Sequence, residues 1–356
     1  MVTLKEIAKE CNVSATTVSN ILNGKPKVSE ETRQRVLEVV RKRGYQPNYI
    51  AQGLRNRRTR IVGIIAEDIA QFSTPGMLEG IMAYCEERGY RAVIQNLRLY
   101  ARWQDTWFED ERAYRSVLEP VLQELMSIKV DGVLYVAGHA RILKSFVGFP
   151  LPAVMAYAYG DTPGVPSVVI DDEKGSYDIV KYLISMGHRR IGVLGGRAGN
   201  IHTQKRLQGY QRALFEEQIL YNPGYVCYGD WQRGSGKRLA GELVKAGVTA
   251  IYCMCDRMAG GVYDYFEQHG IQVGKDISVA GFDNQDMAEF FQPALTTMEL
   301  PLTQVGHEAA RILLGRLDAK EKEDAGAEAD WTEGEEEKKS PCKLIVRDSV
   351  RRILPS

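Results

Sequence analysis

The stretch TLKEIAKECNVSATTVSNILNGKPKVSEETRQRVLEVV, residues 3–40, decides the first part of the fold. Thr3, with Glu6 three residues later, has the spacing of a capping box and predicts the start of a helix. Residues 12–13 predict a turn, after which Ser14 caps a second short helix over 15–22. Two short helices joined by a tight turn form a helix-turn-helix unit, whose second helix can lie in the major groove of DNA.

A third amphipathic helix is predicted over residues 29 to about 43. Its apolar residues would close a small core: Val36, Leu37, Val39 and Val40. A purely structural three-helix bundle is the alternative, but the charge argues against it. Residues 1–60 hold 13 Lys/Arg and 5 Asp/Glu, about +8, whereas the whole chain is neutral. Segregated positive charge is typical of a surface that binds phosphates.

The next segment, GYQPNYIAQGLRNRRTRIVGII (44–65), predicts a hinge. Pro47 ends the preceding helix, and Asn48 can cap a new helix that reaches about Asn56. So short a helix is marginal alone in water, and Gly53 weakens it by roughly 1 kcal/mol. We therefore expect it to fold only when it is paired and placed on DNA.

The composition fits a chain of two or three domains with a large core, since 44% of its 356 residues are apolar. No apolar run approaches 20 residues, and the N-terminus is charged where a signal peptide would be apolar. We expect a cytoplasmic protein, and six cysteines fit a reducing compartment. Cys253 and Cys255 lack a second ligand pair, so strand-end packing is favoured over zinc binding.

Short apolar runs alternate with amphipathic helices over residues 61–317, which is βαβ repetition and predicts parallel sheets. The expected strands are 61–66, 91–95, 132–136, 153–156, 167–170, 191–194, 250–253 and 277–281. The expected helices are 77–88, 174–186, 204–218, 236–246 and 258–268. Such sheets bind ligands beyond the carboxyl ends of their strands.

Two glycine-rich segments resemble nucleotide sites but fail in detail. LGGRAGN (194–200) lacks the G-x-G-x-x-G spacing, and GSGKR (234–238) has Trp231 and Arg238 where a P-loop needs Gly and Ser/Thr. No nucleophile elbow or metal-ligand spacing is present, and the five histidines are scattered along the sequence. These patterns predict no metal site and do not favour an enzyme.

Several motifs occur in the order of one family. They are VSATTVSNILNG, the hinge segment, VGII, GHRRIGVLGG, RLQGY, ISVAGFDN, PALTTMELP and LIVRDS. From about Val2 to Arg352 the chain resembles the lac-repressor-type (LacI/GalR) family of bacterial transcriptional regulators.

The resemblance implies an α/β fold with two parts. An N-terminal three-helix helix-turn-helix domain (1–46) and a hinge helix with linker (47–60) precede a two-lobed periplasmic-binding-protein-like effector domain (61–356). Lobe 1 is expected at about 61–160 and 293–322, and lobe 2 at about 161–292 and 342–356. The chain would cross between these parallel-sheet lobes near 160, 292 and 325–342.

The DNA contacts are expected in the first 60 residues. Ala15 and Thr16 lie at the start of the recognition helix and Asn20 lies one turn along it, so all three should face base edges. The amide of an Asn side chain suits a contact with adenine. The resemblance gives Leu54 the role of a wedge in the minor groove, with hinge-to-hinge packing as the alternative. The phosphate contacts are expected from Thr3, Ser14, Thr17, Ser19, Asn23, Thr32, Arg55 and Arg57. Tyr45, Asn48 and Ala51 complete the expected DNA-binding set.

A ligand pocket is expected at the strand ends of the effector domain. Asp283 directly follows a strand, Arg206 opens a helix and Trp231 ends the YGDW segment. A carboxylate, a guanidinium and an indole suit a polyhydroxylated ligand. The alternatives are a strand-end cap for Asp283 or Asp256 and a surface ion pair for Arg206. The resemblance adds Asp256, while the loops add Phe72, Asn200 and His202. We expect a sugar effector and no cofactor.

Two insertions depart from the family pattern. Residues 98–120, rich in Trp, Tyr and Arg, predict an extended helix and loop on the surface rather than a ligand lid. Residues 318–340 hold 10 Asp/Glu and 4 Lys and predict a disordered acidic loop.

Together these patterns predict a dimeric repressor of a carbohydrate-utilisation operon that binds a palindromic operator. The chain would not be an enzyme. The rival classes are a secreted sugar receptor, which would lack residues 1–60, and an enzyme on this fold.

Overall fold

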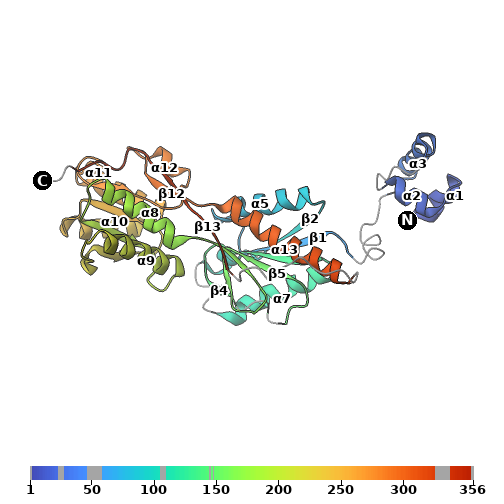
Figure 1. The fold of residues 1–356 in the computed structure, drawn as a ribbon, viewed down its shortest axis with the longest axis horizontal. Coiled ribbons are helices and arrows are strands. Elements are labelled where there is room, and N and C mark those ends of the chain that lie inside the picture. The colour runs from blue at the N-terminus through green and yellow to red at the C-terminus, as the bar shows by residue number, and fades with distance from the viewer. Residues whose placement is uncertain are drawn as a thin grey trace. The chain divides into compact units, whose positions relative to one another are not determined.

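The computed structural model describes residues 2–22, 28–45, 58–104, 110–143, 146, 148–324 and 337–353. The chain divides into two compact units, Met1–Thr59 and Arg60–Ser356, and each is described by itself (Figure 1). Within the described residues, no helix combines the length and the apolar character that crossing a membrane requires.

In its described residues the first unit holds three helices, α1 (Leu4–Glu10), α2 (Ala15–Leu22) and α3 (Glu30–Lys42). The capping box at its start is confirmed: the Glu6 amide donates to Thr3 Oγ1 at 3.3 Å, and the Thr3 amide donates to Glu6 Oε2 at 2.7 Å. The three helices pack around a small hydrophobic core formed by Ile7, Ala8, Cys11, Val18, Ile21 and Val36. The expected hinge helix lies outside the described residues.

The second unit begins with a lobe built on a six-stranded parallel sheet, ordered β13-β7-β5-β3-β1-β2. Its strands are β1 (Ile61–Ala66), β2 (Arg91–Asn96), β3 (Gly132–Val136), β5 (Ala153–Ala156), β7 (Ser167–Ile170) and β13 (Glu337–Ser340). Alternate residues of these strands face two separate cores. Helices α5 (Thr74–Glu87) and α13 (Leu302–Asp324) cover one face, and α7 (Glu111–Ser127) covers the other (Figure 1).

Helices α5 and α13 approach each other closely because glycines lie at their crossing. A Cβ at Gly80 would meet the Thr303 carbonyl oxygen at 2.0 Å. This contact ties α13, which lies far along the chain, to the first lobe.

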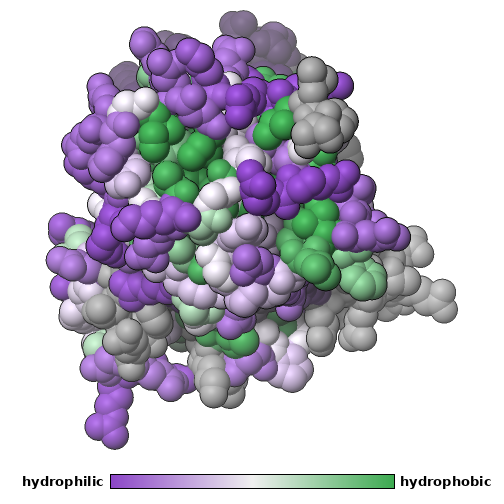
Figure 2. All heavy atoms as spheres, turned by 90° about the vertical axis from the view of Figure 1, so that its left-hand side faces the viewer, coloured by the Kyte–Doolittle hydropathy of each residue, from purple (hydrophilic) through white to green (hydrophobic). Residues whose placement is uncertain are grey.

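The second lobe has a four-stranded parallel sheet, ordered β11-β10-β8-β9. Its strands are β8 (Ile191–Gly195), β9 (Val226–Tyr228), β10 (Ala250–Cys253) and β11 (Ser278–Ala280). Two helix pairs pack on it: α8 (Asp172–Ser185) with α9 (Ile201–Glu216), and α10 (Arg233–Lys245) with α11 (Asp256–Gln268). Figure 2 shows the outer end of this lobe, where apolar patches interrupt a largely hydrophilic surface. Phe215, Leu220 and Phe290 are among its exposed apolar side chains.

The shorter elements lie in the connections between these helices and strands. They are α6 (Leu99–Trp103), β4 (Ile142–Leu143), β6 (Tyr159–Gly160), the 3-10 turn η2 (Pro223–Tyr225), α12 (Met287–Phe290), β12 (Thr297–Glu299) and β14 (Lys343–Ile345). Strands β12 and β14 pair antiparallel.

Two crossings between the lobes differ from the expected positions. Strand β7 pairs with β5 in the first sheet, so the chain leaves the first lobe after Ile170 rather than near 160. Strand β12 still adjoins the second lobe through a bridge between Ala280 and Thr296, and α13 is the first element back in the first lobe. The second crossing therefore lies near 300 rather than 292. The apolar run at 167–170 predicts a strand but does not say which sheet it joins.

The acidic segment is also more ordered at its ends than expected. Helix α13 continues to Asp324, and residues 337–340 form β13 beside β7. The prediction of a loop over all of 318–340 is wrong at both ends, because helix propensity and strand pairing outweigh the charge there. Residues 325–336 lie outside the described part of the chain.

Candidate functional site

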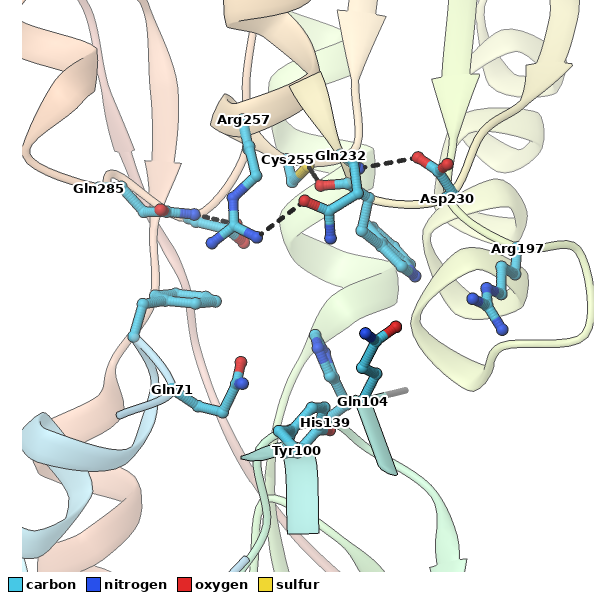
Figure 3. Close-up of a pocket in the computed structure, with 13 residues that line it drawn as sticks. Gln71, Tyr100, Gln104, His139, Arg197, Asp230, Gln232, Cys255, Arg257 and Gln285 are labelled. Carbon is cyan, nitrogen blue, oxygen red and sulfur yellow. Dashed lines mark hydrogen bonds between the residues drawn. The ribbon is translucent and has the colours of Figure 1, made fainter. Parts of the chain in front are cut away.

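A cavity of about 480 Å³ lies between the two lobes, at the carboxyl ends of their strands. The first lobe contributes loops after β1, β2 and β3, and the second lobe contributes loops after β8, β9, β10 and β11 (Figure 3). The lining residues are Gln71, Phe72, Tyr100, Gln104, His139, Arg197, Asp230, Trp231, Gln232, Cys255, Arg257, Asp283 and Gln285. Three of the seven expected effector residues are among them: Phe72, Trp231 and Asp283.

Asp283 lies just beyond β11 in a positive-φ conformation, with φ of 113°. Its amide donates to the Met298 carbonyl at 2.8 Å, and its Oδ2 accepts from Gln285 Nε2 at 3.0 Å. Burial raises the pKa of this carboxyl to about 7, although the nearby Arg206 guanidinium acts in the opposite direction. The site therefore holds a carboxyl group that can change its protonation near neutral pH.

Arg206 does not line the cavity, which corrects the expectation from sequence. It is 2% exposed. Its Nε donates to Asp172 Oδ1 at 2.7 Å, its Nη1 donates to the Met254 carbonyl, and Asp283 Oδ1 lies 3.7 Å from Nη1. Because these buried oxygen atoms bind the guanidinium, it does not project into the cavity. It forms an ion pair with Asp283, which does line the cavity.

Asn200, His202 and Asp256 are also not among the residues that line the cavity. Asn200 caps α9 by accepting from the His202 amide at 2.9 Å. Asp256 accepts from Thr297 Oγ1 at 2.6 Å and from the Gln285 amide at 2.8 Å. Burial and the charge of Asp283 raise the pKa of Asp256 well above its ordinary value. Asp256 is thus the strand-end cap that was the alternative interpretation.

Aromatic rings gather on one side of the cavity. The His139 and Trp231 rings lie 6.5 Å apart at 24°, and the His139 and His202 rings lie 6.2 Å apart. Trp231 fits closely against Gly196, where a Cβ would meet the indole at 2.0 Å. His139 and His202, which are far apart along the sequence, thus lie close together in space. Burial, then Arg141, lowers the pKa of His139 well below its ordinary value, so this ring is neutral.

The segment after β2 faces the cavity rather than the surface. Tyr100 and Gln104 line the cavity, and the Tyr100 hydroxyl accepts from Arg141 Nη2 at 2.6 Å. Asp68 holds the segment by accepting from the Ala101 amide at 3.3 Å. The surface interpretation of 98–120 is wrong for Tyr100 and Gln104, which line the cavity. Residues 105–109 lie outside the described chain.

Sequence reasoning missed most of the polar lining. The missed residues are Gln71, Tyr100, Gln104, His139, Arg197, Asp230, Gln232, Cys255, Arg257 and Gln285. Their one shared signal is position, because each follows a predicted or observed parallel strand. Cys255 both packs as expected and lines the cavity.

The chemistry of this lining favours binding. Four glutamines, two arginines and two aspartates offer hydrogen bonds, while Trp231 and Phe72 offer apolar ring faces. Burial raises the pKa of the Cys255 thiol, so it stays protonated and is a poor nucleophile. Among the described residues, no cluster of His, Cys, Asp or Glu could hold a metal ion.

Replacing Asp283 by Asn is expected to change how stability depends on pH. The folded pKa of about 7 lies above the ordinary 3.8, so this carboxyl favours the folded chain at acidic pH, and that contribution is lost as the pH rises towards 7. Wild type should lose stability relative to Asp283→Asn between pH 5 and pH 7, by about 1.4 kcal/mol for each pH unit. Urea denaturation at both pH values measures this. A stability difference that does not vary with pH contradicts the prediction.

The helix-turn-helix unit fully buries none of the expected DNA-facing residues that the structure describes, although Ala15 and Tyr45 pack against its core. Helix α2 buries Val18 and Ile21. The remaining expected residues within the described chain are exposed or half-buried: Thr3, Ser14, Ala15, Thr16, Thr17, Ser19, Asn20, Thr32 and Tyr45. Ser14 Oγ accepts from the Thr17 amide at 3.0 Å, which fixes the start of α2. Asn23, Asn48, Ala51, Leu54, Arg55 and Arg57 lie outside the described residues.

The comparisons with known proteins agree with this architecture. Residues 3–48 match the model for bacterial regulatory proteins of the lacI family, and residues 180–350 match that for a periplasmic binding protein-like domain. Catabolite control protein A of Priestia megaterium is 31% identical over 320 residues, covering 88% of this chain and 91% of that protein. The transcriptional repressor PurR of Vibrio campbellii is 30% identical over 358 residues, covering 99% and 100%.

A solved structure shows the same fold. The lac repressor dimer bound to operator and the anti-inducer ONPF superposes with a TM-score of 0.76 at 23% identity, covering 98% of this chain and 99% of that one. The chain therefore belongs to the LacI family of bacterial regulatory proteins and is a DNA-binding transcriptional repressor that responds to a small-molecule effector.

Proposed function

We propose that this protein represses a carbohydrate-utilisation operon from the cytoplasm, bound as a dimer to a palindromic operator. Each helix-turn-helix would read one half-site. The exposed apolar side chains of the second lobe, Phe215, Leu220 and Phe290, fit a chain that associates with a second copy. The protein would act by binding alone, without catalysis.

The lining of the interlobe cavity carries the proposal of a sugar effector. Trp231 and Phe72 present flat apolar surfaces that suit the C–H face of a sugar ring. Asp283 and the glutamines can bind hydroxyl groups as donors and acceptors. Arg197 and Arg257 also line the cavity, so uronates and phosphorylated sugars belong among the candidates.

A planar nitrogenous base is the second candidate. The nearly parallel His139 and Trp231 rings, 6.5 Å apart, favour a flat ligand, and amide side chains can bind the edge of a base. A base lacks the hydroxyl groups of a sugar, so its binding would not need a carboxylate.

A thermal-shift screen with the full chain distinguishes the candidates. The probes are galactose, cellobiose, galacturonate, glucose 6-phosphate, guanine and hypoxanthine. A probe present at one hundred times its Kd adds about 2.7 kcal/mol to stability. We expect a sugar to raise the Tm, Trp231→Ala to abolish the shift, and Met126→Ala, at an exposed site on α7, to preserve it. A shift with the bases alone would reject the sugar.

Asn20→Ala is expected to change the base preference of operator binding. Asn20 lies on α2 off the buried face that holds Val18 and Ile21, so its amide is available for a bidentate contact with adenine. Such a contact discriminates against other bases by roughly 1–3 kcal/mol. Selection from a randomised DNA library measures the preference of both proteins. An identical preferred site would show that Asn20 does not read a base.

A further inference from the structure

A hydrogen bond joins the two lobes beside the cavity. The Ala140 amide, in the loop after β3 of the first lobe, donates to His202 Nε2 on α9 of the second lobe at 2.9 Å. Both residues are 2% exposed, so water does not compete for this bond. An amide can only donate, and therefore Nε2 must be unprotonated here.

Asp172 sets the state of the same imidazole ring. Its Oδ2 lies 2.7 Å from His202 Nδ1, and its carboxylate is 1% exposed. Burial acts to raise the pKa of Asp172, but His202 and Arg206 outweigh it and the pKa is lowered. An ionised carboxylate accepts only, so the proton of neutral His202 resides on Nδ1 and leaves Nε2 free to accept.

The carboxylate that orients His202 also holds the guanidinium behind the cavity. Asp172 Oδ1 accepts from Arg206 Nε at 2.7 Å, and Arg206 Nη1 lies 3.7 Å from Asp283 Oδ1. A continuous polar chain therefore runs from the cavity wall through Arg206, Asp172 and His202 to the first lobe.

We propose that His202, oriented by Asp172, is a positioning residue that fastens the second lobe to the first and links this contact to the cavity through Arg206. The other neutral tautomer, with the proton on Nε2, would place a donor against the Ala140 amide, and the fastening would be lost. Movement of Asp283 by a bound molecule would reach the same contact through Arg206 and Asp172.

The aromatic rings that the structure places around His202 do not supply an alternative charge. The Tyr157 ring lies 5.1 Å away and the His139 ring 6.2 Å away. Burial raises the pKa of Tyr157 and lowers that of His139 far from neutrality, so both stay uncharged. The Trp231 ring, 6.5 Å away, does not titrate. Asp172, with Arg206 beyond it, is the charged partner that decides the tautomer.

The first test needs no ligand, and it reads the tautomer in the wild-type chain. The full chain is labelled with ¹⁵N-histidine, and long-range ¹H–¹⁵N correlation spectra at pH 7.5 report the tautomer of each ring. The His202 signal is assigned by its absence from His202→Gln. We expect a protonated Nδ1 and an unprotonated Nε2. A proton on Nε2 overturns the proposal.

Hydrogen–deuterium exchange at Ala140 tests the fastening itself. His202→Phe should speed exchange of this amide by roughly tenfold, the effect of losing one buried hydrogen bond. Asp172→Asn, which does not touch Ala140, should speed it in the same direction. His307→Gln is the matched control, because this histidine lies on α13 with a side chain 43% exposed. A variant that has unfolded is recognised by fast amide exchange throughout the β8 segment. In that case the tautomer of His202 in the wild-type chain decides whether the proposal holds. Unchanged exchange in a folded His202→Phe overturns the proposal.

Discussion

Replacing Arg206 by Met is expected to lower the free energy of unfolding by about 3–5 kcal/mol, the usual cost of removing one partner of a buried ion pair. The substitution leaves Asp172, 1% exposed, and Asp283, 6% exposed, without their shared cation. It also removes the guanidinium that lies 3.8 Å from the Phe282 ring centroid. Urea denaturation followed by circular dichroism measures the loss.

Arg233→Met is the matched control for this prediction. Arg233 pairs with Asp264 at 2.6 Å, but its side chain is 51% exposed, so its loss should cost about 0–1 kcal/mol. If Arg206→Met costs no more than Arg233→Met, the buried guanidinium does not stabilise the site as described.

Raising the salt concentration from 50 to 200 mM is expected to weaken operator binding by about a thousandfold. Residues 1–60 carry 13 Lys/Arg against 5 Asp/Glu, and a dimer would present two such surfaces to DNA. Each neutralised phosphate contributes about −0.9 to the slope of log affinity against log salt, so several contacts produce an effect of this size. Fluorescence anisotropy with a labelled operator, measured across this range, gives the slope. A slope near zero would show that phosphate contacts do not dominate.

Local patterns were sufficient for much of the fold. The capping box of Thr3 and Glu6 and the caps Ser14 and Ser29 define three helices by contacts within four residues. The apolar runs at Ile61–Ala66 and Ala250–Cys253 mark buried parallel strands, whose neighbours cover both faces.

Long-range pairing explains what the sequence could not predict. Strand β13 reads EKKS, a charged run without strand character, and forms because it pairs with the edge of the first sheet at β7. Strand β9 is three residues long and half-exposed, too short for a periodic pattern. Strand β7 belongs to the first lobe because it pairs with β5. The residues of β7 alone do not indicate which sheet it joins.

In the candidate site, too, local position predicted some residues, whereas long-range contacts decide the orientation of others. Asp283 was predicted from its position after a strand and Trp231 from the end of the YGDW segment, and both line the cavity. Arg206 and His202 follow the same rule of position, yet Asp172 turns both inward through hydrogen bonds of 2.7 Å. Asp172 opens α8, thirty residues before His202, and no spacing in the sequence indicates that the three meet.

The most direct test of a ligand-switched repressor is the affinity of the full chain for its operator with and without effector. The operator is the palindrome recovered by selection from a randomised library, and the effector is the probe that raises the Tm. Fluorescence anisotropy should show binding at least about a thousandfold tighter than to random DNA, and the effector should change that affinity by roughly 5- to 150-fold. Equal affinity for random DNA, or an operator affinity that the effector leaves unchanged, would contradict the account.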